Sequence, residues 1–179
     1  RIRRGLTKHK GVDGYIRRFC TSDQSENNFI YYVLGKKERH TLADYVTGVE
    51  ETSTNKIVLY SSAQTGKTTE LKQLCWELQQ SGLYLPVSFE VRTNTKLKRD
   101  DLPESQYVDG REVVLVIDAL DEVNGQKYED LLEEIGGYAY EHPEMKMVLS
   151  CRSNFRRERQ LELFTELFLE ELSIDDARD

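Results

Sequence analysis

The stretch Lys56–Leu71, KIVLYSSAQTGKTTEL, joins an apolar run to a polar loop and then to the start of an amphipathic segment. Lys56–Tyr60 is a short, β-prone apolar run of the kind found in buried parallel strands. Between Lys67 and Ser81 apolar residues recur at the spacing of one helix face, and Gly82 follows as a stop signal. These recurring residues are Leu71, Leu74, Cys75 and Leu78. The pattern predicts a strand, a loop and a helix in direct succession.

The loop follows the phosphate-binding pattern G-x-x-x-x-G-K-[ST], except that Ser61 stands at the position of the first glycine. In such a loop, backbone N–H groups at a helix N-terminus bind phosphate oxygens, and Gly66 permits the close approach. Lys67 would place its charge on the β- and γ-phosphates, and the Thr68 hydroxyl would complete the coordination of Mg²⁺. The predicted nucleotide contacts are Ser61, Ser62, Ala63, Gln64, Thr65, Gly66, Lys67, Thr68 and Thr69.

Two observations bear on whether this loop is functional. A G-K-T tripeptide also occurs by chance in ordinary polar loops, so the flanking strand and helix are what favour phosphate binding. The serine matters only where the backbone needs a positive φ, which glycine alone adopts at low energy. We therefore expect nucleotide binding to survive Ser61, and the hydrolysis rate to be the more sensitive property.

A second chemical cluster follows the most strand-like run of the chain, Glu112–Ile117, in the sequence VVLVIDALDEV. Asp118 ends that run, so it is expected at the carboxyl edge of the sheet, where open α/β folds bind ligands. A carboxylate there can hold Mg²⁺ through water, and either Asp121 or Glu122 can orient or deprotonate an attacking water. The plainer alternative, that these two acids begin a helix, does not explain Asp118.

A third polar cluster follows the run Met145–Ser150 in the sequence MKMVLSCRSNF. Its position places Ser150 and Arg152 at the same edge of the sheet as Asp118. Arg152 can then sense or stabilise the γ-phosphate as an arginine supplied in cis. The alternative is that Arg152 is merely the first solvent-exposed residue after the strand.

The order of elements predicts an α/β fold with a parallel sheet and helices on both faces. Further strands are expected at Leu83–Val91 and at Glu166–Leu172, the latter favoured over the end of a helix, and a helix is expected at Tyr128–Glu141. The interval from Val91 to Glu112 is polar and a poor helix former, although parallel crossovers are usually helical. Either this crossover is irregular or residues are missing from it.

Composition limits the classes of function. A chain of 179 residues with 38% hydrophobic and 32% charged residues is a polar globular protein of one domain of ordinary size. Its apolar runs are too short for a membrane-spanning helix. Three widely spaced cysteines indicate a reducing compartment, so a cytoplasmic location is expected. The start of the chain is basic, but the net charge of −7 argues against a dedicated nucleic-acid domain.

The motifs GKTTEL, hhhhDALDEV and hhSCRSNF, where h is an apolar residue, resemble those of the NACHT branch of the STAND nucleotide-binding switches, which are related to AAA+ ATPases. The resemblance covers about residues 15–179. It implies a P-loop NTPase three-layer sandwich with a five-stranded parallel sheet ordered 5-1-4-3-2. Lys67 and Thr68 would be Walker A residues, Asp118 the Walker B acid and Arg152 the sensor 1 arginine. Asp121 and Glu122 would be the acidic pair, and Tyr15 and Ile16 would wall the adenine.

The resemblance also implies an organisation. Residues 1–50 would be a basic lead-in and helical segment beside the nucleotide pocket. Residues 51–179 would be the NTPase core, truncated before helical and winged-helix subdomains. The cofactors would be ATP or ADP with Mg²⁺ bound by Thr68 and Asp118, and the catalytic residues Glu122, Asp121 and Arg152.

By the same resemblance, nucleotide exchange would control homo-oligomerisation and a linked effector in antiviral or innate immune defence. The wording of the motifs favours a bacterial member of the family. An activating ligand, such as a pathogen or phage protein, would be read by a region outside this sequence, and neither a membrane nor a nucleic acid would be bound directly here.

Two other classes are weighed against this one. A GTPase needs a guanine-reading N-K-x-D motif after a later strand, and Asn55-Lys56 precedes the loop and lacks the aspartate. A small-molecule kinase needs an arginine-rich lid, for which Asn154–Arg159 is only a weak candidate. A nucleic-acid motor of helicase type carries Glu directly after the Walker B Asp, whereas Ala119 follows Asp118 here.

Overall fold

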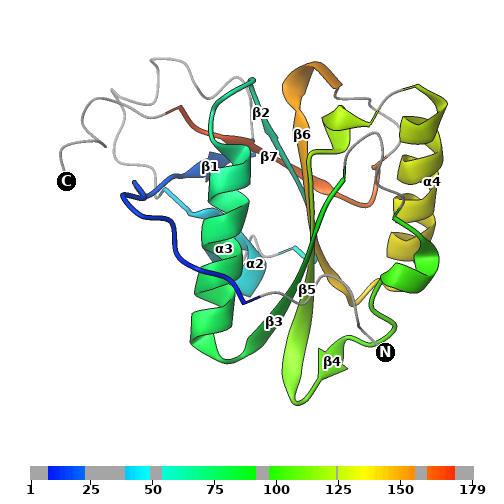
Figure 1. The fold of residues 1–179 in the computed structure, drawn as a ribbon, viewed down its shortest axis with the longest axis horizontal. Coiled ribbons are helices and arrows are strands. Elements are labelled where there is room, and N and C mark those ends of the chain that lie inside the picture. Colours follow the sequence, from blue (N-terminus) through cyan, green and yellow to red (C-terminus); the bar gives the residue numbers. More distant parts are fainter. Residues whose placement is uncertain are drawn as a thin grey trace.

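A computed structural model describes residues 8–22, 39–48, 54–91, 97–123, 125–155 and 161–171. Residues 1–7 of the basic start, the acidic tail from residue 172 and most of the candidate lid at Asn154–Arg159 lie outside the described residues. Figure 1 shows one twisted sheet with α2 and α3 on one face and α4 on the other. Within the described residues, no helix is both long and apolar enough to cross a membrane.

In the described part of the chain the sheet has seven strands, in the order β1-β7-β2-β6-β5-β3 with β4 paired to β5. Their bounds are β1 Cys20–Thr21, β2 Lys56–Ser61, β3 Tyr84–Glu90, β4 Tyr107–Val108, β5 Arg111–Asp118, β6 Lys146–Arg152 and β7 Thr165–Leu169. The five longer strands are parallel, and along the sheet they come fifth, first, fourth, third and second in chain order. The expected sheet of five parallel strands is therefore corrected, because β1 and β4 extend it as antiparallel additions. Both are only two residues long, too short to leave a periodic pattern in the sequence.

The helices are α2 Leu42–Thr47, α3 Lys67–Ser81 and α4 Gln126–Glu141. The bounds of α3 agree with the prediction, and its four predicted inward residues are all buried. Helix α4 begins two residues earlier than predicted, directly after Gly125. The segment after residue 164 is a strand, β7, which decides between the two alternatives considered for it.

Two apolar cores lie on opposite faces of the sheet because side chains alternate along each strand. In β2, Val58 and Tyr60 belong to the core under α4, whereas Ile57 and Leu59 belong to the core under α2 and α3. The strands β5 and β6 divide in the same way, with Leu115 and Val116 on opposite sides. Both faces of the central strands are therefore buried, which explains their continuous apolar sequences.

The crossover from β3 to β5 is irregular over its described part. It contains a 3₁₀ helix, Arg99–Asp101, and then strand β4, which forms a hairpin with β5. Leu102 is buried against the α4 side, and the Tyr138 hydroxyl of α4 donates a 2.6 Å hydrogen bond to the Pro103 carbonyl. Residues 92–96 lie outside the described part. Strand β3 ends the sheet order, and Pro86 lies within it, as edge strands permit.

Candidate phosphate-binding site

The predicted phosphate loop joins the end of β2 to the start of α3, at the edge of the sheet where the parallel strands end (Figure 1). Gly66 precedes the helix with φ of 91°, and Gln64 has φ of 62°. Ser61 is the last residue of β2 and does not have a positive φ. The position therefore makes no conformational demand that serine cannot meet, and the glycine that the backbone requires is Gly66.

Lys67 is folded over the loop that precedes it. Its ammonium donates to the Ser61 hydroxyl at 3.1 Å and lies 3.4 Å from the Ser62 carbonyl oxygen. Burial lowers the pKa of Lys67, while Asp121 raises it, Arg152 lowers it and Asp118 raises it. The lysine thus lies within electrostatic range of the acids and of the arginine that follow β5 and β6.

The first turn of α3 has no side-chain cap, because Gly66 occupies the N-cap position. The N–H groups of that turn are left for another acceptor, which is the property that makes helix N-termini bind anions. Thr68 and Thr69 are exposed there. Polar groups within the loop bond to each other instead: the Thr65 hydroxyl donates to the Ser62 carbonyl at 2.8 Å and lies beside the Ser61 hydroxyl, which can donate to it.

Asp118 ends β5 as predicted, and its side chain is 8% exposed. Its Oδ1 accepts from the Ala119 N–H at 2.8 Å and from the hydroxyl of Ser150, a fully buried residue of β6. The Ala119 N–H also donates to Ser150 Oγ at 3.0 Å. Among the described residues, no hydrogen bond is made to Asp118 Oδ2. One carboxylate oxygen is therefore fixed in place while the other is left for a ligand.

Asp121 and Arg152 form an ion pair across the ends of β5 and β6. Asp121 Oδ2 lies 2.7 Å from Arg152 Nε, and Oδ1 accepts from the Arg152 backbone N–H at 3.0 Å. The Asp121 side chain is 4% exposed and that of Arg152 is 44% exposed. Both oxygens of Asp121 are thus engaged by Arg152, whereas the neighbouring Glu122 is exposed. Of the two acids, Glu122 is the one with access to an attacking water.

The residues fit a magnesium ion that is bound together with phosphate. In the described parts of the chain, no group of three or more His, Cys, Asp or Glu side chains forms a self-sufficient metal site. Mg²⁺ usually keeps several waters and binds one or two carboxylates together with substrate phosphates. Asp118, with its open Oδ2, and the exposed Thr68 supply that smaller set of ligands.

The two residues predicted to wall the adenine lie in the segment before β1. Tyr15 is half-buried, and its hydroxyl donates to Glu70 Oε2 at 2.8 Å, in the first turn of α3. Ile16 is 36% exposed. The structure thus places Tyr15 beside the start of α3, and a contact of either residue with adenine stays a prediction.

Two charged residues at the site were not given a role by the sequence. Glu70 is 4% exposed, and burial raises its pKa to about 6. Arg18 is 8% exposed, and its guanidinium donates to the Thr65 carbonyl at 2.7 Å. Glu70 adjoins the apolar face of α3 in sequence, which is the only signal that it is buried. For Arg18 the sequence offers no such signal, because it lies in a basic stretch that is typical of a solvated surface.

Comparisons with known proteins leave function to be inferred from the site. No protein-family profile matches the sequence, and no curated protein is similar to it. Among solved structures, the fold is similar to one described as "Structure of C. elegans PCH-2", with a TM-score of 0.48 and 16% identity. The alignment covers 76% of this chain and 40% of that one, so this chain spans less than half of its length.

Proposed function

We propose that this chain is the nucleotide-binding core of a signalling switch, which binds ATP and ADP with Mg²⁺ and hydrolyses ATP slowly. One observation carries the proposal. The uncapped first turn of α3, the Lys67 ammonium, the Asp118 carboxylate and the Asp121–Arg152 pair all lie at one edge of the sheet. Phosphate binding, metal binding and charge stabilisation are the functions that phosphoryl-transfer sites require.

Each residue has a role in this proposal. The backbone from Ser62 to Thr69 and the Lys67 ammonium bind the phosphates, for which Lys67 leaves its present acceptors on Ser61 and Ser62. Thr68 and Asp118 hold Mg²⁺, which would neutralise the charge that develops on the phosphates. Ser150 and the Ala119 N–H fix the Asp118 carboxylate.

Hydrolysis is assigned to the two remaining charged groups. Glu122 orients the attacking water, because its neighbour Asp121 is already bonded through both oxygens. Arg152 contacts the γ-phosphate, and Asp121 holds the arginine in place for that contact. Since a nucleotide would compete with Asp121 for the guanidinium, Arg152 is suited to distinguish the diphosphate from the triphosphate state.

The assignment to the NACHT type of switch rests on the residues of the three motifs. The five longer strands follow the order that this type implies, apart from the antiparallel additions β1 and β4. Under this proposal, exchange of ADP for ATP controls self-association and a linked effector in antiviral or innate immune defence. Tyr15 and Ile16 contact the adenine, and a region outside this sequence reads the activating ligand.

The experiment that tests the proposal measures nucleotide carried through purification. The parent chain should retain ADP, whereas Lys67→Ala should lose it, because the loop would lack its only lysine. Lys72→Ala removes an exposed lysine of the same helix and should retain ADP like the parent. A Lys67→Ala protein that retains ADP would show that the site is assigned to the wrong residues.

A second variant tests hydrolysis in the same assay. Glu122→Gln keeps the size of the side chain but removes the carboxylate, so ATP added to the purified protein should persist instead of being converted to ADP. Unchanged turnover in this variant would remove Glu122 from the water-orienting role.

A further inference from the structure

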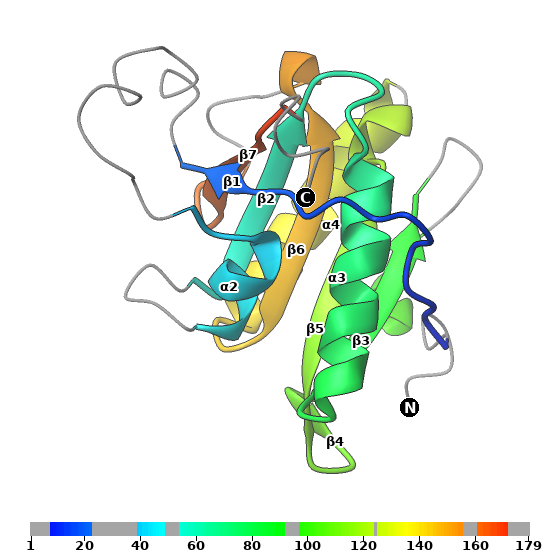
Figure 2. The ribbon, with the colours of Figure 1, turned by 90° about the vertical axis from the view of Figure 1, so that its left-hand side faces the viewer.

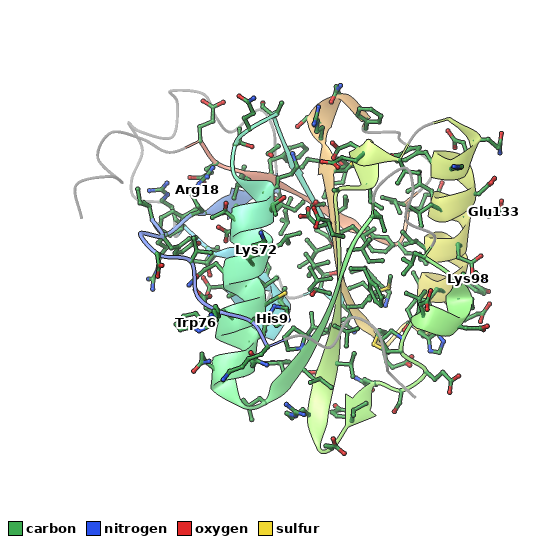
Figure 3. The ribbon with its side chains drawn as sticks, viewed as in Figure 1. His9, Arg18, Lys72, Trp76, Lys98 and Glu133 are labelled. Carbon is green, nitrogen blue, oxygen red and sulfur yellow. The ribbon has the colours of Figure 1, made fainter. Side chains whose placement is uncertain are left out.

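A segment that precedes β1 lies along α3 and ends at the phosphate loop. We call residues 9–18 the strap. Figure 2 shows it crossing the outer side of α3, and Figure 3 labels His9 and Arg18 at its two ends beside the helix. The His9 N–H donates to Gln79 Oε1 at 3.0 Å, and the Val12 N–H donates to Gln73 Oε1 at 3.2 Å.

Further contacts bring the strap to the start of the helix. Gly11 lies against the Trp76 ring, so closely that an added Cβ would come within 3.2 Å of a ring carbon. Beyond it, the Tyr15 hydroxyl donates to Glu70 in the first turn of α3. The strap therefore runs antiparallel to α3, from the end of the helix to its start.

Arg18, the last residue of the strap, joins two backbone segments that are far apart in sequence. Its Nη1 donates to the Thr65 carbonyl in the phosphate loop at 2.7 Å, and its Nη2 donates to the Glu170 carbonyl, directly after β7. The side chain is buried, and the rigid fork of a guanidinium allows two acceptors to be held at once. A buried charge that is satisfied by two carbonyls holds both of them in place, since losing either would leave the charge under-bonded.

The bond to Thr65 has a geometric consequence for phosphate binding. The Thr65 carbonyl and the Gly66 N–H belong to one planar trans peptide, so they point in opposite directions. By holding the carbonyl, Arg18 fixes the direction of the Gly66 N–H, which points away from Arg18. That N–H lies at the N-cap of α3, among the groups that bind phosphate in the proposed function.

We propose that Arg18 is a positioning residue, which aims the backbone of the phosphate loop and couples that loop to the chain segment after β7. The inference rests on the proposed function, because it names the residue that prepares the phosphate site. Through Arg18, phosphate binding at Gly66 stabilises the backbone at Glu170 in its present position. Because such a coupling is reciprocal, a fixed backbone at Glu170 also strengthens phosphate binding.

The first measurement is the affinity for ADP in the presence of Mg²⁺. Arg18→Met keeps much of the aliphatic stem but donates to neither carbonyl, and we expect ADP to bind about tenfold more weakly or worse. Arg18→Lys can reach one carbonyl only, so its loss should be intermediate. Arg39→Met is the matched control, because Arg39 bonds to the side-chain carboxylate of the same Glu170 and stacks on the Phe19 ring. Its affinity should stay within about twofold of the parent.

The second measurement is amide hydrogen exchange at the loop and after β7. In the nucleotide-free protein, Arg18→Met should speed exchange at residues 62–68 and at 170–171, while Arg39→Met leaves the loop unchanged. In the parent, ADP should slow exchange at residues 170–171. At saturating ADP this protection should be lost in Arg18→Met, which an arginine that only stabilises the fold would not cause.

The outcomes are distinguishable. If the parent binds no ADP, the proposed function fails, and the role of Arg18 in phosphate binding fails with it. If the parent binds ADP and Arg18→Met is folded with the same affinity and the same loop exchange, the inference alone is overturned. Should Arg18→Met not fold, Arg18→Lys decides: parental affinity and parental protection at residues 170–171 would overturn the inference.

Discussion

At the scale of single residues, the loop shows how a motif can depart from its pattern without losing its backbone geometry. The glycine of the pattern is replaced by Ser61 at a position where φ is not positive, while Gly66 is kept where φ is 91°. An added Cβ at Gly66 would also lie 3.3 Å from Arg18 Nη1. The two positions therefore differ sharply in what they tolerate.

This difference predicts opposite outcomes for two substitutions. Ser61→Gly restores the motif, yet we expect its ADP affinity to stay within about threefold of the parent, because the backbone already has the required conformation. Gly66→Ala should bind ADP at least about tenfold more weakly, since a side chain in the left-handed region costs about 1–2 kcal/mol and also crowds Arg18. Calorimetric titration with ADP measures both. A large gain in affinity for Ser61→Gly would contradict this view of the loop.

Glu70 makes the stability of the protein depend on pH. Burial raises its pKa to about 6 from an ordinary 4.5, against the opposing effects of the Tyr15 hydroxyl and Arg18. Below about pH 4.5 the carboxyl is protonated both folded and unfolded. As the pH rises through 6, the folded state must bury a carboxylate, so the stability that the neutral form contributes is lost.

The free energy of unfolding of Glu70→Gln relative to that of the parent should therefore be higher at pH 7.5 than at pH 4.5, by at most ~2 kcal/mol. The free energy of unfolding in urea, measured at both pH values, gives this difference. Glu133→Gln, an exposed position on α4, should show no such change with pH. If Glu70→Gln differs from the parent by the same amount at both pH values, the carboxyl does not titrate as described.

At the scale of elements, the sequence predicted the position of strands and helices best where most of their residues are buried. β2, β5, β6 and α3 have apolar residues at nearly every position, or at helical spacing, so their place and inner faces could be predicted. β1 and β4 are too short for any period, and the strap is held by polar groups such as Gln73 and Gln79 whose partners are distant in sequence. Asp118 and Arg152 could be predicted as edge residues, but the pairing of Arg152 with Asp121 could not, since it depends on how two adjacent strands end.

A buried hydrogen bond joins the irregular crossover to α4, in addition to the Arg99–Glu141 ion pair nearer the surface. The Tyr138 hydroxyl donates to the Pro103 carbonyl, and the ring is 1% exposed. Tyr138→Phe should lower the free energy of unfolding by about 1–2 kcal/mol, because the carbonyl loses its partner inside the protein. Tyr140→Phe on the same helix is the control, since Tyr140 is 78% exposed, and it should have no measurable effect. Equal stabilities of the two variants would mean that the hydroxyl contributes nothing.

At the scale of the whole molecule, the two cores share the same central strands, so we expect them to unfold together. Leu149→Ala leaves a cavity in the core under α4 and should destabilise the protein by about 2–5 kcal/mol. Trp76, the only tryptophan, lies on α3 at the opposite face. The urea unfolding transitions followed by its fluorescence and by far-UV circular dichroism should move to lower urea concentration together. If the fluorescence transition of Leu149→Ala kept the urea midpoint of the parent, the two faces would unfold separately.

The position of Pro86 has a consequence for how copies of this chain can associate. In parallel pairing, alternate residues direct both N–H and C=O to the same neighbour. The Leu83 carbonyl and the Val91 N–H bond to β5, so the odd-numbered residues of β3 face inward and Pro86 faces the outer edge, where its backbone carbonyl bonds to His9. The missing N–H of proline therefore interrupts the row of donors on which an incoming strand would have to pair. Filaments that grow by adding strands to this edge are therefore disfavoured.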